Sequence, residues 1–338
     1  MNEKIDILKG LAILGVIAIH VDSNLFNFVA DGTIIKNGIF TFDQMVRFSV
    51  PFFVFLSGLA LGSKYLDQKI NFVEFFKRRV LKLLPLYFFW TGIIYLITHL
   101  VSSWSGFSDS FPLWQVIFWG KAEYHLYFVP MIFQLYLLFP IFLFFIRKKP
   151  YLFLAITFIF QLVLLWQFPR QIAWTDQEQY IFAGSWVFYF VLGIYFAQRT
   201  VSFRTSVARS GIYLGIFLTM VWVIADTFNL LKNHENIIIA TRSSKISVYF
   251  YSIFVILGSN FLPDIFKKLR KILIFVGKNS YLIYLSHTLI IRIIFEPFYN
   301  KNIDLFLLIS CAIIVAIGLE LSMLRWNHGK AVPIETQF

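Results

Sequence analysis

The chain has 338 residues, of which 59% are hydrophobic and only 14% charged, and its mean hydropathy is +0.73. Because soluble domains carry about 25% charged residues, this composition excludes an ordinary soluble protein. It predicts an all-α, polytopic membrane protein. The net charge of +12 follows the membrane topology predicted below, so we expect no nucleic-acid partner.

The apolar runs predict the number and direction of the membrane helices. Spans of about 20 residues number about ten: Ile7–Phe28, Gly38–Gly62, Leu83–Leu100, Leu126–Ile146, Tyr151–Phe168, Tyr180–Gln198, Gly211–Leu230, Ile246–Phe261, Ile272–Phe295 and Leu305–Leu324. With the N-terminus inside, the inner segments hold twenty Lys and Arg residues and the outer segments eight. Since cytoplasmic loops are the basic ones, both termini are predicted to be cytoplasmic. No polar block interrupts the chain, which predicts one membrane-embedded domain, 1–338, without a soluble appendage.

The first span carries ionisable residues on one face. Ten residues separate Lys9 from His20, and eleven steps of about 100° return His20 to within about 20° of Lys9. Asp6, one turn before Lys9, lies near the same stripe. Ionisable groups in hydrocarbon are costly and often mark a functional path. We therefore interpret His20 as functional, with a packing histidine as the alternative.

The second span contains Arg47, followed by Val50-Pro51, an aromatic run and Ser57-Gly58. Asp43 precedes Arg47 by four residues, so the two side chains share a helix face and are expected to pair. A purely structural ion pair and a functional arginine are both compatible with this spacing.

A basic stretch follows, from Asn71 to Pro85. Its apolar residues recur at helical spacing beside Arg78, Arg79 and Lys82, which predicts an amphipathic helix on the inner membrane surface. Attraction to anionic lipid is one interpretation, and a landing site for the phosphates of a cytosolic cofactor is the other. No glycine-rich phosphate loop occurs, so side chains must hold such a cofactor.

Polar residues reappear in the outer loop before the fourth span and in the ninth span. Glu123 and His125 lie at the predicted outer mouth. Ser280, Tyr284 and His287 are spaced by four and three, so they share one helix face. That polar stripe indicates either a cavity lining or a structural hydrogen-bond network.

Together these motifs resemble the acyltransferase-3 family of integral membrane acyltransferases. The family signature is a basic residue, ten residues and a histidine; Lys9 stands where the family usually has Arg. The resemblance continues in the second span, in a basic pair three residues apart before a proline, and in the ninth span. The residues that carry it are Lys9, His20, Arg47, Pro51, Ser57, Gly58, Arg79, Lys82, Gly277, Ser280, Tyr281, Tyr284, Leu285 and His287.

The resemblance implies transfer of an acyl group, expected to be acetyl from cytosolic acetyl-CoA, onto a hydroxyl of a carbohydrate or other cell-envelope acceptor. His20 would be the general base, and Arg47, His287 or Tyr284 would stabilise the oxyanion. Expected donor-binding residues are Lys9, Arg78, Arg79 and Lys82, and expected acceptor-side residues are Glu123 and His125. We expect no metal, and a location in the bacterial plasma membrane.

A transporter or flippase of a glycan or small molecule is the alternative, since buried Arg and His residues also bind translocated substrates. The sequence shows no internal repeat and no paired broken helices, which many transporters have.

Overall fold

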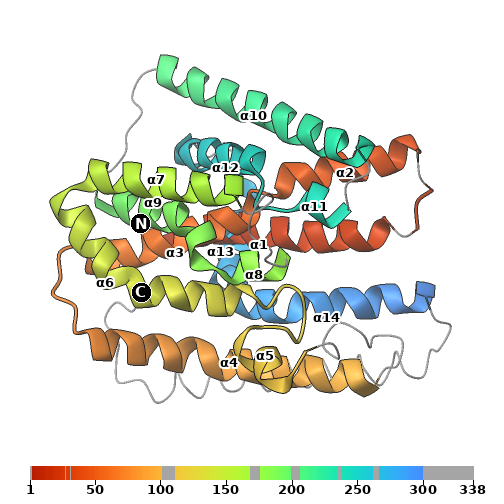
Figure 1. The fold of residues 1–338 in the computed structure, drawn as a ribbon, viewed down its shortest axis with the longest axis horizontal. Helices are drawn as coiled ribbons and strands as arrows, with labels where there is room; N and C mark the ends of the chain where they lie inside the picture. The colour runs from red at the N-terminus through yellow and green to blue at the C-terminus, as the bar shows by residue number, and fades with distance from the viewer. Residues whose placement is uncertain are drawn as a thin grey trace. The chain divides into compact units, whose positions relative to one another are not determined.

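A computed structural model describes residues 2–26, 28–30, 32–100, 111–167, 176–198, 206–233, 237–261 and 266–299. All regular secondary structure in these ranges is helical, which confirms the predicted all-α class (Figure 1). The α-helices are α1 (Asn2–Leu25), α2 (Ile34–Val46), α3 (Ser49–Tyr65), α4 (Phe72–Leu100), α5 (Leu113–Phe118), α6 (Phe128–Lys148), α7 (Pro150–Gln167), α8 (Asp176–Ile181), α9 (Val187–Gln198), α10 (Ser206–Lys232), α11 (Ile237–Thr241), α12 (Ile246–Gly258), α13 (Phe266–Lys278) and α14 (Ser280–Tyr299). Two short 3₁₀ turns, η3 (Ala183–Ser185) and η4 (Ser259–Phe261), accompany them.

Five helical segments in the described residues are long and apolar enough to cross a membrane. They are Ile34–Tyr65, Phe72–His99, Phe128–Lys148, Pro150–Gln167 and Ser206–Lys232. Shorter apolar helices cover Val187–Gln198 and Ser280–Ile294. A multi-pass membrane protein is thus supported. The total of ten spans and the cytoplasmic termini stay predictions, and the expected span Leu305–Leu324 lies outside the described residues.

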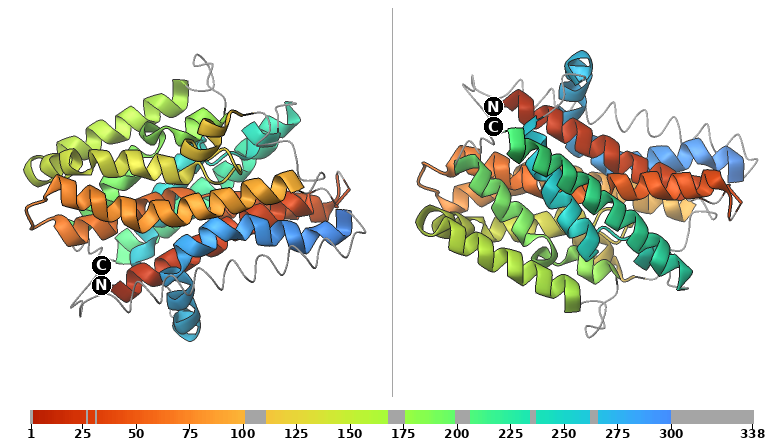
Figure 2. Two further views of the ribbon diagram at one scale, coloured as in Figure 1. Left: turned by 90° about the horizontal axis from the view of Figure 1, so that it is seen from below. Right: turned by 90° about the horizontal axis from the view of Figure 1, so that it is seen from above.

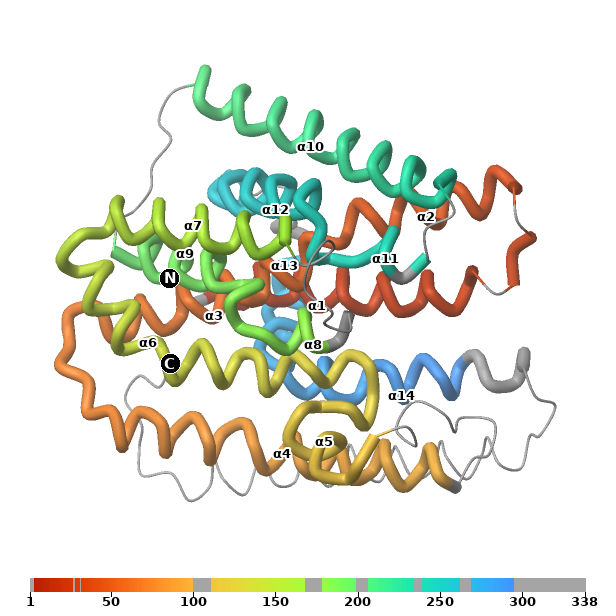
Figure 3. Tube along the Cα trace, viewed as in Figure 1, coloured from red at the N-terminus to blue at the C-terminus, as the bar shows by residue number. Residues whose placement is uncertain are grey.

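Three predicted boundaries differ from the structure. The second span is divided at Arg47 and Phe48 into two helices. Figure 3 labels them α2 and α3. The expected surface helix is not a separate element, because α4 continues from it through Pro85 into the apolar run. The ninth span is divided at Asn279 into α13, which is amphipathic and basic, and α14. Hydropathy averages across such breaks, whereas a helix end depends on local backbone bonds and packing.

The described helices fall into two compact units. The first comprises the described residues of Met1–Phe76 and Tyr127–Tyr281, and the second those of Lys77–Leu126 and Leu282–Phe338. The expectation of one membrane-embedded domain stays a prediction.

In the first unit, α3 packs on α9, and α10 packs on α12 and α2 (Figure 2). The α3–α9 contact is close because a Cβ atom at Gly58 would meet the backbone of Phe190. Small residues permit such close approach of helices in membranes. In the same unit α1 packs against α2, α3 and α13. Gly10 lies against the backbone of Leu273 in α13, so α1 is fixed near the position of Lys9.

In the second unit, α5 is tied to α4 by the Tyr87 hydroxyl, which donates to the Ile117 carbonyl at 2.8 Å. Trp90, also on α4, is fully buried. The loop after α5 is fixed to α14 by an ion pair between Glu123 and Arg292. These contacts position the polar residues of the loop between α5 and α6.

Candidate active site

Lys9 and His20 lie on one uninterrupted helix, α1, as their spacing requires. The Lys9 ammonium is 3.9 Å from the Asp6 carboxylate, and Lys9 is partly exposed. His20 is half-buried, and its backbone carbonyl accepts a hydrogen bond of 2.8 Å from the Asn24 amide. The residue as a whole is partly accessible on α1, whereas its Nδ1 atom is buried.

Arg47 is fixed by Asp43. Its Nε donates to Asp43 Oδ2 at 2.9 Å and its Nη2 to Oδ1 at 2.7 Å, with Asp43 fully buried. The predicted i,i+4 pair is thus confirmed, in a bidentate form. Among the described residues no group binds Nη1 of Arg47, whose side chain is 12% exposed. A cation held in this way can present its remaining N–H groups to an anion.

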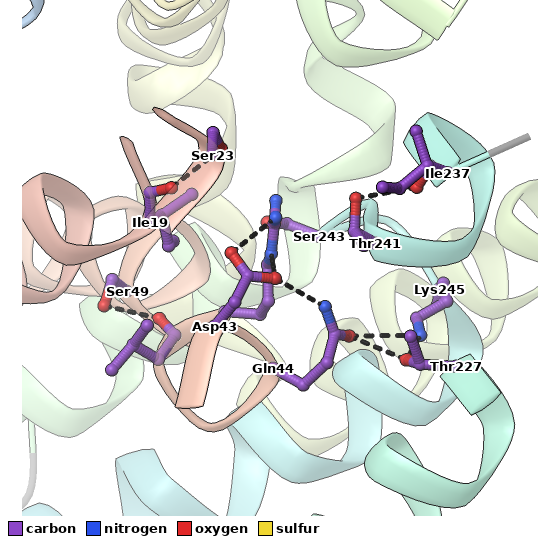
Figure 4. A network of polar contacts seen from close by, with 12 residues as sticks. Ile19, Ser23, Asp43, Gln44, Ser49, Thr227, Ile237, Thr241, Ser243 and Lys245 are labelled. Atoms are coloured by element: carbon purple, nitrogen blue, oxygen red, sulfur yellow. Dashed lines mark hydrogen bonds and ion pairs between the residues drawn. The ribbon is translucent and has the colours of Figure 1, made fainter. Parts of the chain in front are cut away.

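A buried polar network extends from Asp43 (Figure 4). The Gln44 amide nitrogen donates to Asp43 Oδ2 at 2.7 Å, and its Oε1 accepts from Thr227 at 2.8 Å and from Lys245 at 3.2 Å. Lys245 also bonds Thr227 and lies 3.6 Å from Asp226. The network therefore joins α2, α10 and the start of α12.

Asp22 relates the His20 region to this network. It lies two residues beyond His20 and is buried on α1, within electrostatic range of Asp43 and Arg47. Because α1 packs on α2, His20 on α1 and Arg47 directly after α2 belong to the same packed part of the first unit.

A second polar cluster lies in the second unit. Arg292 Nη2 is 2.7 Å from a carboxylate oxygen of Glu123, which is 2% exposed. The rings of His125 and His287 approach edge to face, with centroids 4.9 Å apart. The Tyr284 hydroxyl donates to the backbone carbonyl of His125. Burial raises the pKa of Glu123, although Arg292 beside it acts in the opposite direction.

The contact of His287 with Tyr284 decides its tautomer. His287 Nδ1 is 2.7 Å from the Tyr284 carbonyl oxygen, which can only accept, so Nδ1 carries the proton. In the neutral ring, Nε2 is then the basic nitrogen. His287 is therefore suited to accept a hydrogen bond or a proton at Nε2. Thr288, on the same helix, lies 3.3 Å from His125 Nδ1 through its hydroxyl.

The basic residues expected to bind the donor lie in both units. Arg78, Arg79 and Lys82 follow one another within α4 in the second unit; Arg78 and Lys82 are exposed and Arg79 half-buried. Lys9 belongs to the first unit. Their joint action on one ligand stays a prediction.

The structure groups the predicted residues differently from the sequence. Glu123 and His125, expected on the acceptor side, form one cluster with Tyr284 and His287, expected to be catalytic. His20 and Arg47 belong to the other unit. The spacing of residues along the chain did not indicate Gln44, Thr227, Thr288, Arg292 or Lys245, because each has a partner far away in the chain. The only signal was that Lys245 directly precedes an apolar span, with an aspartate near the end of the span before it.

Comparison with known proteins adds the decisive observation. The family model described as an acyltransferase domain, that of the acyltransferase-3 family, matches residues 2–324, nearly the whole chain. The chain belongs to the acyltransferase-3 family. No curated protein and no solved structure matches it.

Membership of the acyltransferase-3 family makes the chain a membrane acyltransferase. It thereby favours the enzyme over the transporter that composition alone left open. It also gives the polar residues of α1 and α2 a reaction to be tested against, since acyl transfer needs a base and an oxyanion-stabilising group.

Proposed function

We propose that this acyltransferase moves an acetyl group from cytosolic acetyl-CoA to a hydroxyl of a carbohydrate or other cell-envelope acceptor in the bacterial plasma membrane. His20 takes the proton of the acceptor hydroxyl, and the resulting oxygen attacks the thioester carbonyl. The carbon–sulfur bond then breaks, and the thiolate of CoA takes the proton from His20. No metal enters this route.

The observation that carries the proposal is the arrangement of Arg47. The Asp43 carboxylate holds two nitrogens of the guanidinium, and Nη1 has no partner among the described residues. A preorganised cation of this kind supports the negative charge that develops on the carbonyl oxygen, worth about 10²–10³ in rate where one such donor is removed.

The remaining roles follow from charge and position. Lys9, Arg78, Arg79 and Lys82 would bind the phosphates of CoA from the cytosolic side, as the basic residues of the sequence suggest. Glu123, His125 and His287, with Tyr284 holding the His125 backbone, would bind acceptor hydroxyls, because a buried carboxylate and a neutral imidazole are both hydrogen-bond acceptors.

Labelled acetyl-CoA and membrane glycan fractions, incubated with purified protein, test this function. His20→Ala and His20→Gln should each reduce transfer by about 10²–10⁴-fold. Gln keeps hydrogen-bonding capacity but accepts no proton at neutral pH, so it separates a base from a packing residue. Lys9→Arg restores the residue usual in the family and should stay active.

Transfer by His20→Gln at a near wild-type rate would show that His20 is not the base, and His287 would be the next candidate. Label that never leaves CoA in any envelope fraction, with wild-type protein that is folded, would overturn the proposed acceptor class.

A further inference from the structure

We infer that Gln44, Thr227 and Lys245 are positioning residues, which hold the Asp43–Arg47 pair in the geometry that acyl transfer requires. This inference rests on the proposed role of Arg47 and extends it to residues on α10 and α12. None of the three touches the reacting atoms; they act through Arg47.

Thr227 and Lys245 first fix the orientation of the Gln44 amide. Its oxygen accepts from Thr227 at 2.8 Å and from the Lys245 ammonium at 3.2 Å. An amide turned by 180° would place its NH₂ group against an ammonium, donor against donor. The two contacts therefore direct the NH₂ group to Asp43, where it donates to Oδ2 at 2.7 Å.

The Gln44 amide in turn holds the Asp43 carboxylate, which binds Arg47. Oδ2 accepts from Gln44 and from Nε of Arg47, and Oδ1 accepts from Nη2 of Arg47. Rotation of the carboxylate would break these bonds in a fully buried site. Since unpaired buried polar groups are costly, the guanidinium is held side-on and Nη1 keeps one direction.

Lys245 closes the network from the other end. An ammonium group has three N–H donors, and three acceptors lie around Lys245: Gln44 Oε1, the Thr227 hydroxyl and Asp226 Oδ2 at 3.6 Å. Lys245 is 4% exposed. A charged, fully partnered lysine at this depth makes the orientation of Gln44 dependent on α10 and α12.

Such a network matters to rate because its buried members behind Arg47, which are Asp43, Gln44, Thr227 and Lys245, all have partners. Satisfied buried polar networks impose one arrangement on their members, and misplacement of a reacting group by about 1 Å can cost about 10²-fold. Loss of Lys245 or Gln44 should therefore lower kcat through Arg47, with little change in KM for the donor.

A double-mutant cycle tests this connection. Lys245→Met should lower kcat by about tenfold or more in the wild-type background and by less than about twofold in Arg47→Ala, because coupled residues are non-additive. Gln44→Glu should behave as Lys245→Met does; it is nearly isosteric and still accepts from Lys245, but it sets a carboxylate against Asp43. Full additivity of Lys245→Met and Arg47→Ala would overturn the inference.

Matched controls separate this effect from a general loss of packing. Lys232→Met removes an exposed lysine at the end of α10. Thr219→Val removes a hydroxyl of α10 that bonds only its own helix, to the Gly215 carbonyl at 2.6 Å and to Ile216. Both should keep kcat within about twofold. A loss in the controls equal to that in Lys245→Met would make the effect structural and overturn the inference.

A measurement that does not depend on acyl transfer tests whether the network holds the Arg47 guanidinium. Phenylglyoxal modifies arginine side chains, and mass spectrometry of the Arg47 peptide gives the rate at that residue. Release of the guanidinium in Lys245→Met or Gln44→Glu should raise this rate by about threefold or more. An unchanged rate in both variants overturns the positioning role. A raised rate in a protein without transferase activity would support the positioning role and overturn only the proposed reaction.

Discussion

Arg47 binds Asp43 side-on, through Nε and Nη2, and leaves Nη1 without a partner among the described residues. Asp43 lies four residues before Arg47, so α2 itself supplies the pairing geometry. Arg47 follows the last residue of α2, where the chain passes through Phe48 into α3. The break in the apolar run thus coincides with the residue that the proposed reaction needs.

Arg47→Lys should abolish most transferase activity although it keeps the charge. A lysine offers one ammonium, which cannot both bind Asp43 in the bidentate manner and face an oxyanion. We expect kcat to fall by about 10²-fold, the scale of a lost oxyanion donor, with donor KM nearly unchanged. Measured kcat within about threefold of wild type would show that the fork geometry is not needed.

Arg79→Ala and Lys82→Ala should raise KM for the acyl-CoA donor more than they lower kcat. Each removes a cation whose contacts with phosphate are alike in the ground state and the transition state. A lost charged hydrogen bond of about 1.5–3 kcal/mol corresponds to about tenfold or more in affinity. Lys77→Ala, an exposed change on the same helix, serves as the control. If all three variants kept the wild-type KM for the donor, this part of α4 would be a lipid-contacting surface only.

The loop between α3 and α4 should face the cytosol, as the distribution of Lys and Arg predicts. Lys69 is exposed in this loop, so Lys69→Cys in a Cys311→Ser background can be labelled without disturbing the core. An impermeant maleimide should react in inverted vesicles and not in intact cells. Asn37→Cys, exposed on the predicted outer side, should show the reverse. Labelling of Lys69→Cys in intact cells would reverse the orientation and the proposed donor side.

His287→Asn and His287→Leu should separate a structural histidine from a substrate-binding one. The Asn amide can donate to the Tyr284 carbonyl in place of Nδ1, whereas Leu leaves that carbonyl without its donor. We expect Asn to keep thermal stability near wild type yet to raise KM for the acceptor by about tenfold, since Nε2 is lost. Wild-type acceptor kinetics in His287→Asn would assign His287 a structural role alone.

Transfer should fall as pH rises through about 8, through loss of the proton on Lys245. Burial lowers the pKa of Lys245 to about 8, while Asp226 opposes this and Arg47 and Arg242 add to it. A neutral amine has two N–H donors and cannot serve three acceptors. Lys245→Arg, which stays charged, should move the alkaline limit of kcat upward. An alkaline limit at the same pH in that variant would exclude Lys245 as its cause.

Lys245 should make the free energy of unfolding increase over the pH range in which activity falls. Because the folded-state pKa lies below the ordinary value of about 10.4, the unfolded chain binds more protons between these values. The contribution of Lys245 to the free energy of unfolding therefore increases from pH 8 upward. Thermal unfolding over this range, compared between wild type and Lys245→Met, shows whether the alkaline loss of activity is separate from unfolding.

The sequence by itself determined the relationships that lie within one helix. Spacing placed Lys9 and His20 on one face of α1, paired Asp43 with Arg47, and put Tyr284 and His287 on one side of α14. These follow from the rise and rotation of an α-helix, which neighbours in the chain fix without help from the fold. Hydropathy was likewise enough for the all-α class, because continuous apolar runs of about 20 residues fit spanning helices, whereas barrel strands are shorter and alternate.

Only the tertiary structure decided which residues meet across helices. Gln44 bonds Thr227 and Lys245, which are 183 and 201 residues away, and His125 meets His287 from a loop before α6. No local period encodes such contacts, because they depend on how the faces of α2, α10 and α12 are set against one another. The breaks at Arg47 and Asn279 were hidden for a related reason. An apolar run favours burial equally on both sides of a break, and packing and local backbone bonding decide where the helix ends.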